Sequence, residues 1–385
     1  MFMADFLSPS VNFIGKGTLA EIGPRTKMFG TKALIVTDKV LSGLPGGPVD
    51  QVKKHLETAG IPYAIYNEVP PNPRDTSVAE GKKIYQAEKC DVLVSVGGGS
   101  PHDCAKGIGI AMTHPGDLYA DYAGIEKLTN ALPPILCVNT TAGTGSEVTR
   151  HCVITNTKQK VKFVIVSWRN LPMVSINDPE LMLAKPAGLT AATGMDALTH
   201  AVECYITLAA NHITDALSLK AIRLISDNLR RAVAYGEDLE AREAMAYASV
   251  MAGMAFNNAG LGYVHAMAHQ LGGLLDMAHG VANAVLLPHV ERWNLMVNPK
   301  KFADIAVAMG ENIDGLGMME AAETAIKAIE RLSKDVGIPS GLASLGVKES
   351  DLEPMAVTAL QDGNAGCNPR KGNQDDIVAM FKAAM

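Results

Sequence analysis

The stretch DVLVSVGGGSPHDCAKGIGIAM, residues 91–112, decides the fold of the first half of the chain. Its valine-rich apolar run predicts a short buried strand, and three glycines follow that run directly. Pro101 comes next and fits the first turn of a helix, where a missing amide hydrogen is tolerated. A strand, a tight turn and a helix in this order predict one unit of an α/β fold.

Segments of the same kind lie on both sides of this stretch. We expect strands at residues 32–38, 63–69 and 133–141, helices at 49–60 and 76–90, and a hairpin at 151–167 with NTKQ as its turn. Apolar runs that alternate with helices of this length are typical of a parallel sheet covered on both faces. The first half therefore predicts a Rossmann-like, dinucleotide-binding α/β domain.

The second half of the chain has helical periodicity almost throughout. Clear examples are the segments 214–236, 241–260 and 321–337. The change of pattern falls around residues 178–188, where two prolines bracket a connection. We expect the α/β domain to span residues 1–184 and an all-helical domain to span residues 185–385. The active site is expected in the cleft between the two domains.

Composition limits the class of protein. The chain has 385 residues, 48% of them hydrophobic, and a formal net charge of −6. No excess of lysine and arginine is present to bind nucleic-acid phosphates, and no run of eighteen apolar residues predicts a membrane span. The start, MFMADFLSPS, does not resemble a signal peptide, and the six cysteines form no Cys-x-x-Cys pair. We expect a soluble cytoplasmic enzyme with a small-molecule substrate.

Two glycine-containing turns predict where a nucleotide binds. Gly97 to Gly99 precede a helix, and the turn NTTAGTGSE at residues 139–147 also follows a strand. Glycines let the backbone approach an anion, and free amides at a helix N-terminus bind phosphate oxygens, although either turn can be purely structural. Asp38 ends an earlier strand, where it can either accept hydrogen bonds from an adenosine ribose or cap a helix. The first alternative favours NAD over NADP.

Histidines and one aspartate in the helical half indicate a metal site. Asp196 and His200 are four residues apart, so they share a helix face, and His265 and His269 repeat that spacing before His279. A single histidine on an apolar helix is more often a core residue, but this combination suits Fe(II), Zn or Mn. A metal acting as a Lewis acid beside a nicotinamide would assist alcohol oxidation. The spacing does not separate His265 from His269.

Several longer motifs carry a family resemblance. GGGSPHDCAKG, NTTAGTGSE, GLTAATGMDALTHAVECY and AFNNAGLGYVHAMAHQLGG with HGVANAVLLPHV resemble the iron-dependent, or group III, alcohol dehydrogenases. The resemblance runs from about Phe13 to the C-terminus. It implies an NAD-dependent enzyme that interconverts short primary alcohols or diols and aldehydes. It also implies a homo-oligomer, either a dimer or a larger assembly.

The same resemblance implies roles for individual residues. The metal ligands would be Asp196, His200, His265 and His279, and His269 would be free to relay a proton. The residues implied at the cofactor are Asp38 and Asn72 near the adenosine, Gly98, Gly99 and Ser100 at the pyrophosphate, Thr140, Thr141, Thr144 and Ser146 along the pyrophosphate and nicotinamide ribose, and Lys162 at a ribose hydroxyl. Phe256 and Cys367 would line the substrate pocket.

Alternative functions remain open from the sequence. A methanol or ethanol dehydrogenase or a lactaldehyde reductase of the same family differs from a diol dehydrogenase by a few substrate atoms. A non-redox lyase of the dehydroquinate-synthase type would need basic side chains for a phosphorylated acid, and residues 256–290 contain no lysine or arginine. A binding protein without chemistry has no reason to keep all four ligands. The ligands themselves do not distinguish iron from zinc or another divalent metal.

Overall fold

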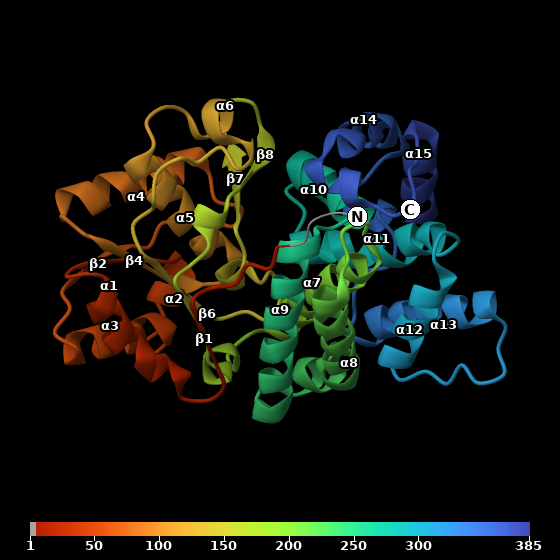
Figure 1. Cartoon of the computed structure of the whole chain (residues 1–385), viewed down its shortest axis with the longest axis horizontal. Helices are drawn as coiled ribbons and strands as arrows, with labels where there is room; N and C mark the ends of the chain where they lie inside the picture. Colours follow the sequence, from red (N-terminus) through yellow and green to blue (C-terminus); the bar gives the residue numbers. More distant parts are fainter. Residues whose placement is uncertain (1–4) are drawn as a thin grey trace. The chain divides into compact units, whose positions relative to one another are not determined.

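The structure is a computed structural model that describes residues 5–385 (Figure 1). Residues 1–4 lie outside the described range, and they are the start of the segment MFMADFLSPS, in which no signal peptide is predicted. Two compact units are present. The α/β unit comprises residues 7–141 and 145–183, and the helical unit comprises residues 184–385 with residues 5–6 and 142–144.

A six-stranded sheet is the centre of the α/β unit. Its strands are β1 (Val11–Ile14), β2 (Ala33–Val36), β3 (Tyr63–Tyr66), β4 (Val92–Gly97), β6 (Ile135–Asn139) and β9 (Val174–Asn177). The order is β1-β9-β6-β4-β2-β3, and every neighbouring pair is parallel. The predicted parallel sheet is therefore confirmed, although β1 and β9 were not among the expected strands.

Helices cover both faces of this sheet. They are α1 (Ile22–Phe29), α2 (Lys39–Ser42), α3 (Pro48–Thr58), α4 (Asp75–Ala87), α5 (Gly99–Thr113) and α6 (Leu118–Tyr122). Successive residues of a strand enter different cores: Leu34 packs in the core that contains Ile108 of α5, whereas Ile35 packs in the core that contains Val52 of α3. This alternation explains why the buried strands read as continuous apolar runs.

The predicted hairpin forms a second, smaller sheet. Strands β7 (His151–Asn156) and β8 (Val161–Val166) pair antiparallel, and β5 (Gly124–Ile125) adds to the other side of β8. Short 3-10 helices connect the regular elements of the chain: η1 (Thr18–Glu21), η2 (Ser146–Val148), η3 (Trp168–Asn170), η4 (Pro179–Met182), η5 (Ala343–Leu345) and η6 (Gly363–Cys367).

The helical unit contains no strand in residues 184–385, all of which the structure describes. Its α-helices are α7 (Ala187–Ile206), α8 (His212–Ala234), α9 (Leu239–Ala259), α10 (Tyr263–Leu275), α11 (His279–Asn294), α12 (Pro299–Ala308), α13 (Met318–Asp335), α14 (Glu349–Gln361) and α15 (Gln374–Ala383). One large apolar core joins them and confirms the predicted all-helical half. Within residues 5–385, no helix combines the length and hydropathy needed to cross a lipid bilayer.

Candidate metal centre

Helix α7 supplies the first two predicted metal ligands. Asp196 and His200 lie one turn apart on this helix, and their residues are only 2% and 3% exposed. Alanine, methionine and leucine surround them in the sequence, so the helix packs its other faces into the apolar core. The two polar side chains therefore share one buried face, as their spacing predicted.

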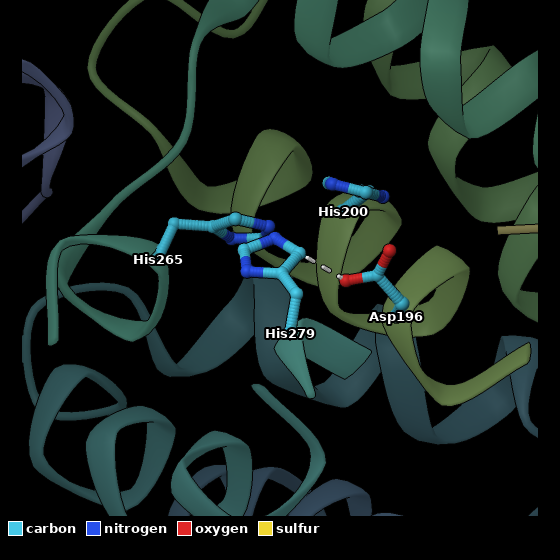
Figure 2. Close-up of side chains that lie close together, drawn as sticks. All are labelled: Asp196, His200, His265 and His279. Carbon is cyan, nitrogen blue, oxygen red and sulfur yellow. Dashed lines mark ion pairs between the residues drawn. The ribbon is translucent and has the colours of Figure 1, made fainter. Parts of the chain in front are cut away.

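The other two predicted ligands come from α10 and α11. His265 lies in the first turn of α10, and His279 is the first residue of α11. One candidate ligand atom from each of Asp196, His200, His265 and His279 lies within 4.8 Å of the others. Figure 2 shows these four side chains gathered from the three helices. Nε2 of His279 is 3.7 Å from Oδ1 of Asp196.

The donor set suits a divalent cation. The amide Nδ2 of Asn283 lies 2.7 Å from Oδ1 of Asp196, 3.0 Å from Nε2 of His265 and 3.2 Å from Nε2 of His279. Several acceptor atoms thus converge on a single donor group. Burial lowers the pKa of His200, which favours the neutral imidazole that binds metals. One carboxylate and three imidazoles match the ligand preferences of iron and zinc.

The buried carboxylate of Glu203 is hydrogen-bonded to the ring of His265. One of its carboxylate oxygens, Oε2, is hydrogen-bonded to Nδ1 of His265, and the other accepts the amides of Gly262 at 3.1 Å and Val264 at 2.7 Å. Burial and the nearby charge of Glu291 raise the pKa of Glu203, while hydrogen bonds from the backbone of Gly262, Val264 and His265 oppose the rise. Glu203 was not among the predicted site residues. Its position seven residues after Asp196, two turns along the same helix, is a signal that could have found it.

His269 lies beside the cluster and outside the four-residue set. Its Nδ1 is 2.7 Å from Oδ2 of Asp362, and its ring stacks on His279 with a centroid distance of 5.6 Å. Burial raises the pKa of Asp362, whereas the interaction with His269 and the hydrogen bonds from Asn364 lower it, and the net shift is downward. Asp362 was also missed by the sequence analysis. It follows α14 in a loop, where no helical spacing links it to His269.

The two predicted phosphate-binding turns contact each other. Gly98 is the N-cap of α5, and Gly97 has a left-handed φ of 147°. The amide of Thr140 donates to the carbonyl of Gly97 at 2.9 Å. A Cβ at Gly98 would lie 2.9 Å from Oγ1 of Thr141, so this close approach requires glycine. Gly99 and Ser100 form the first turn of α5, where free helix amides are available to an anion.

The remaining residues of the second turn have different surroundings. Thr144 belongs to the short segment of this turn that groups with the helical unit. The hydroxyl of Ser146 is buried and donates to Oδ1 of Asp103 at 2.7 Å, and it accepts from Nζ of Lys106 at 3.1 Å. This hydroxyl therefore already has partners inside the α/β unit. Its predicted contact with a cofactor stays a prediction.

Asp38, Asn72 and Lys162 are the predicted adenosine and ribose contacts. Asp38 is the N-cap of α2 and accepts the amide of Leu41 at 2.8 Å, so the structure shows the capping role that the sequence left open. Asn72 has a left-handed φ of 55°, and its Oδ1 accepts a 2.7 Å hydrogen bond from Nζ of Lys162. The structure thus brings Asn72 and Lys162 together, while their contact with a cofactor stays a prediction.

The two predicted substrate-pocket residues belong to the helical unit. Phe256 stacks on His200 with a ring-centroid distance of 4.4 Å and an interplanar angle of 21°. Cys367 lies next to Gly260, because a Cβ on that glycine would be 3.0 Å from its Sγ. Burial raises the pKa of the Cys367 thiol. Phe256 is therefore directly beside the metal cluster, and Cys367 lies against the end of the helix that carries Phe256.

Two family models together match almost the whole chain. The model for iron-containing alcohol dehydrogenase matches residues 9–179, and the model for the C-terminal part of the Fe-containing alcohol dehydrogenase family matches residues 190–385. The chain belongs to the iron-containing alcohol dehydrogenase family. The predicted family, the fold class and the alcohol dehydrogenase type of enzyme are thereby confirmed.

Individual relatives agree with this membership. The 1,3-propanediol dehydrogenase of Citrobacter freundii is 66% identical over 383 residues, which is 99% of both chains. The NAD-dependent methanol dehydrogenase of Bacillus methanolicus is 47% identical over the full length of both chains. A crystal structure of a 1,3-propanediol oxidoreductase superimposes over 100% of both chains with a TM-score of 0.98 and 65% identity. These findings agree with iron and NAD as the predicted cofactors.

Proposed function

We propose that the chain interconverts 1,3-propanediol and 3-hydroxypropanal, with NAD as the hydride acceptor and iron(II) as the metal. The observation that carries this proposal is the cluster of one carboxylate and three imidazoles, within 4.8 Å of one another, in a family member 66% identical to a 1,3-propanediol dehydrogenase. We further propose that residues 1–184 act as the NAD-binding domain. Residues 185–385 then act as the metal-binding and catalytic domain.

Four side chains of the helical unit are proposed to hold the metal. Asp196, His200, His265 and His279 supply one carboxylate and three neutral imidazoles, so a bound divalent ion keeps a net positive charge. Bound iron supplies Lewis acidity, which makes an alcohol hydroxyl easier to deprotonate. Zinc or another divalent ion would satisfy the same donor set.

His269 is proposed to move the hydroxyl proton. Its Nδ1 is bound to Asp362, which leaves Nε2 as the nitrogen that can accept a proton, and its side chain is 20% exposed. In alcohol oxidation the carbinol carbon loses a hydride to the nicotinamide, and the hydroxyl loses a proton. The products are the aldehyde, NADH and one proton, so electrons and atoms balance. The exposure of His269 supports its role as the group that passes this proton to solvent.

The α/β unit is proposed to hold NAD. Gly98, Gly99 and Ser100 at the N-terminus of α5 would bind the pyrophosphate, together with Thr140, Thr141, Thr144 and Ser146. Asp38, Asn72 and Lys162 would bind the adenosine side and a ribose hydroxyl. Phe256 and Cys367 are proposed to shape the substrate pocket. The contacts of the glycine turn with Thr140 and Thr141 support this assignment.

The choice of substrate is the part of this proposal that experiment must test most directly. Relatives in the same family include an NAD-dependent methanol dehydrogenase and a lactaldehyde reductase at 47% and 44% identity. One methylene group is worth only about 1–3 kcal/mol of discrimination in a pocket. Iron-loaded protein should be assayed without oxygen on 1,3-propanediol, ethanol, methanol and 1,2-propanediol by the appearance of NADH. A higher kcat/KM for another alcohol than for 1,3-propanediol would overturn the proposed substrate.

The metal assignment has its own test. An Asp196→Ala variant removes the only carboxylate of the cluster and should lose both bound metal and activity. Metal content and NADH formation measure the two effects separately. A variant with full metal content and turnover would refute the ligand assignment.

We also propose that the chain acts in the cytoplasm as a homo-oligomer. All six cysteines are free thiols and five of them are buried, which is typical of proteins in a reducing compartment. Met296 and Met318 leave large apolar side chains 65% and 52% exposed on the helical unit, and such surface often marks contacts between subunits. Sedimentation of the purified protein would test the oligomer, and a single monomeric species would overturn it.

A further inference from the structure

We propose that Glu203 is a positioning residue of the metal site, which fixes the tautomer of His265 so that Nε2 keeps its lone pair for the metal. This inference rests on the proposed metal site and goes beyond it, because Glu203 is not one of the four candidate ligands. The two carboxylate oxygens of Glu203 have separate partners: Oε1 accepts the amides of Gly262 and Val264, and Oε2 meets Nδ1 of His265.

The proton of the His265 ring is assigned by its two neighbours. Nε2 of His265 lies 3.0 Å from the amide Nδ2 of Asn283, which can only donate, so Nε2 must act as the acceptor. The ring proton therefore belongs on Nδ1, where the carboxylate of Glu203 accepts it. A carboxylate that accepts from one ring nitrogen fixes both the tautomer and the orientation of a metal-binding imidazole.

The geometry around Glu203 is specific. Its residue is 1% exposed, and it lies on α7 beside the N-terminus of α10, to which Gly262 is the N-cap. A Cβ at Gly262 would lie 3.0 Å from Oε1 of Glu203 and 2.7 Å from Oδ1 of Asn368, so only glycine permits this approach. Glu203 thus links α7 to the start of α10 through the amides of Gly262 and Val264. Its other carboxylate oxygen orients the imidazole of His265 in the first turn of α10.

A Glu203→Gln substitution separates this role from simple packing. Glutamine has nearly the same shape, but it has one oxygen and one NH2 group. If its oxygen keeps the amides of Gly262 and Val264, its NH2 group faces Nδ1 of His265 and donates to it. The imidazole must then carry its proton on Nε2, which removes the lone pair that faces the metal cluster.

Glu291 provides a matched control in the same buried region. It is 0% exposed, and its Oε2 accepts Nδ2 of Asn294 at 3.1 Å. A glutamine amide has nearly the same shape as the Glu291 carboxyl group, so the substitution keeps the packing of this region. None of its hydrogen bonds among the described residues reaches a candidate metal ligand. Glu291→Gln therefore changes a nearby buried carboxyl and leaves the hydrogen bond between Glu203 and His265 in place.

The experiment compares zinc binding and the ring nitrogens of His265 in the full-length protein. Metal-free wild type, Glu203→Gln and Glu291→Gln are titrated with Zn²⁺ against a coloured chelator at neutral pH. We expect Glu203→Gln to raise the zinc Kd by about 10- to 100-fold, with Glu291→Gln close to wild type. In ¹⁵N-labelled metal-free protein, the His265 ring proton should lie on Nδ1 in wild type and on Nε2 in Glu203→Gln.

Each outcome decides one proposal. Equal zinc Kd values for wild type and Glu203→Gln, or an unchanged His265 tautomer in that variant, would overturn the role of Glu203. If wild type itself binds no zinc, the proposed metal site fails, and the tautomer measurement still tests the role of Glu203. If Glu203→Gln does not fold, the wild-type tautomer decides: a proton on Nε2 of His265 would overturn the inference.

Discussion

Replacing Gly280 with alanine tests whether the distance between α7 and α11 sets the metal site. A Cβ at Gly280 would lie 2.3 Å from the carbonyl oxygen of Ala192, 2.8 Å from its carbonyl carbon and 3.4 Å from Cβ of Asp196. Atoms in normal contact are about 3.5 Å apart, so the two helices must separate by about 1 Å. Gly280 follows His279 directly, and Ala192 lies one turn before Asp196. The substitution is therefore expected to displace two of the candidate ligands, His279 and Asp196.

The expected result is a weaker metal site in a protein that still folds. Overpacking of this kind costs about 1–3 kcal/mol. Metal–ligand distances vary by only about 0.2 Å, so a divalent ion must draw the helices back together as it binds. If the full strain appears in binding, 1–3 kcal/mol corresponds to about 5- to 150-fold in the zinc Kd. Chelator competition measures this change, and thermal unfolding of the metal-free protein measures the strain that remains.

Gly273→Ala is the matched control. Gly273 lies on α10, the helix that carries His265, and a Cβ there would have no atom within 4 Å. The same change of residue should stabilise the protein by about 0.4–1 kcal/mol and leave the zinc Kd unchanged. Wild-type zinc affinity in Gly280→Ala would refute the reasoning that this helix contact sets the metal site.

Three further predictions concern separate features. Ala278, the N-cap of α11, has a φ of −59°, which is the value that proline imposes, so Ala278→Pro should raise the free energy of unfolding by about 0.4–1 kcal/mol, and a decrease in denaturant unfolding would contradict this. The raised pKa of Glu291, about 8 when folded against 4.5 for the free group, means that its contribution to stability falls as pH rises from about 4.5 to about 8. Glu291→Gln should therefore gain stability relative to wild type between pH 5 and pH 8, and an equal difference at both values would disprove it. Gly98→Ala would place a Cβ 2.9 Å from Oγ1 of Thr141, so NADH affinity measured by fluorescence should fall by about 10-fold, and an unchanged affinity would argue against a pyrophosphate at this turn.

The sheet was predictable where its strands contain an uninterrupted run of apolar residues. Strand β2 is entirely apolar, and β4 and β6 each begin with at least three apolar residues before Ser95 and Asn139. Strand β9 is equally buried, but Ser175 interrupts its apolar residues after the first position, and the hydroxyl of Ser175 donates to Oδ1 of Asn12 in β1 at 2.7 Å. A polar pair that forms only between two neighbouring strands leaves no local pattern. For this reason β1 and β9 escaped the sequence analysis.

The sequence predicts which candidate ligands share a helix face. It does not predict which of these side chains contact one another. The spacing of His265 and His269 is the same as that of Asp196 and His200, so it cannot show which imidazole joins the cluster. The difference comes from partners elsewhere in the chain: Glu203 holds His265, and Asp362 holds His269. Such tertiary contacts become visible only once the helices are packed together.

Asp196 on α7 and His279 on α11 are far apart along the chain, so a metal that binds both would affect how long the protein stays folded. An ion bound by the four proposed ligands on α7, α10 and α11 would act as a removable cross-link between segments that no disulfide joins among the described residues. Because it binds only the folded form, its contribution to stability follows the concentration of free ion. A cell short of iron would therefore lose this protein to proteolysis sooner, and the supply of the metal would regulate the amount of enzyme as well as its turnover.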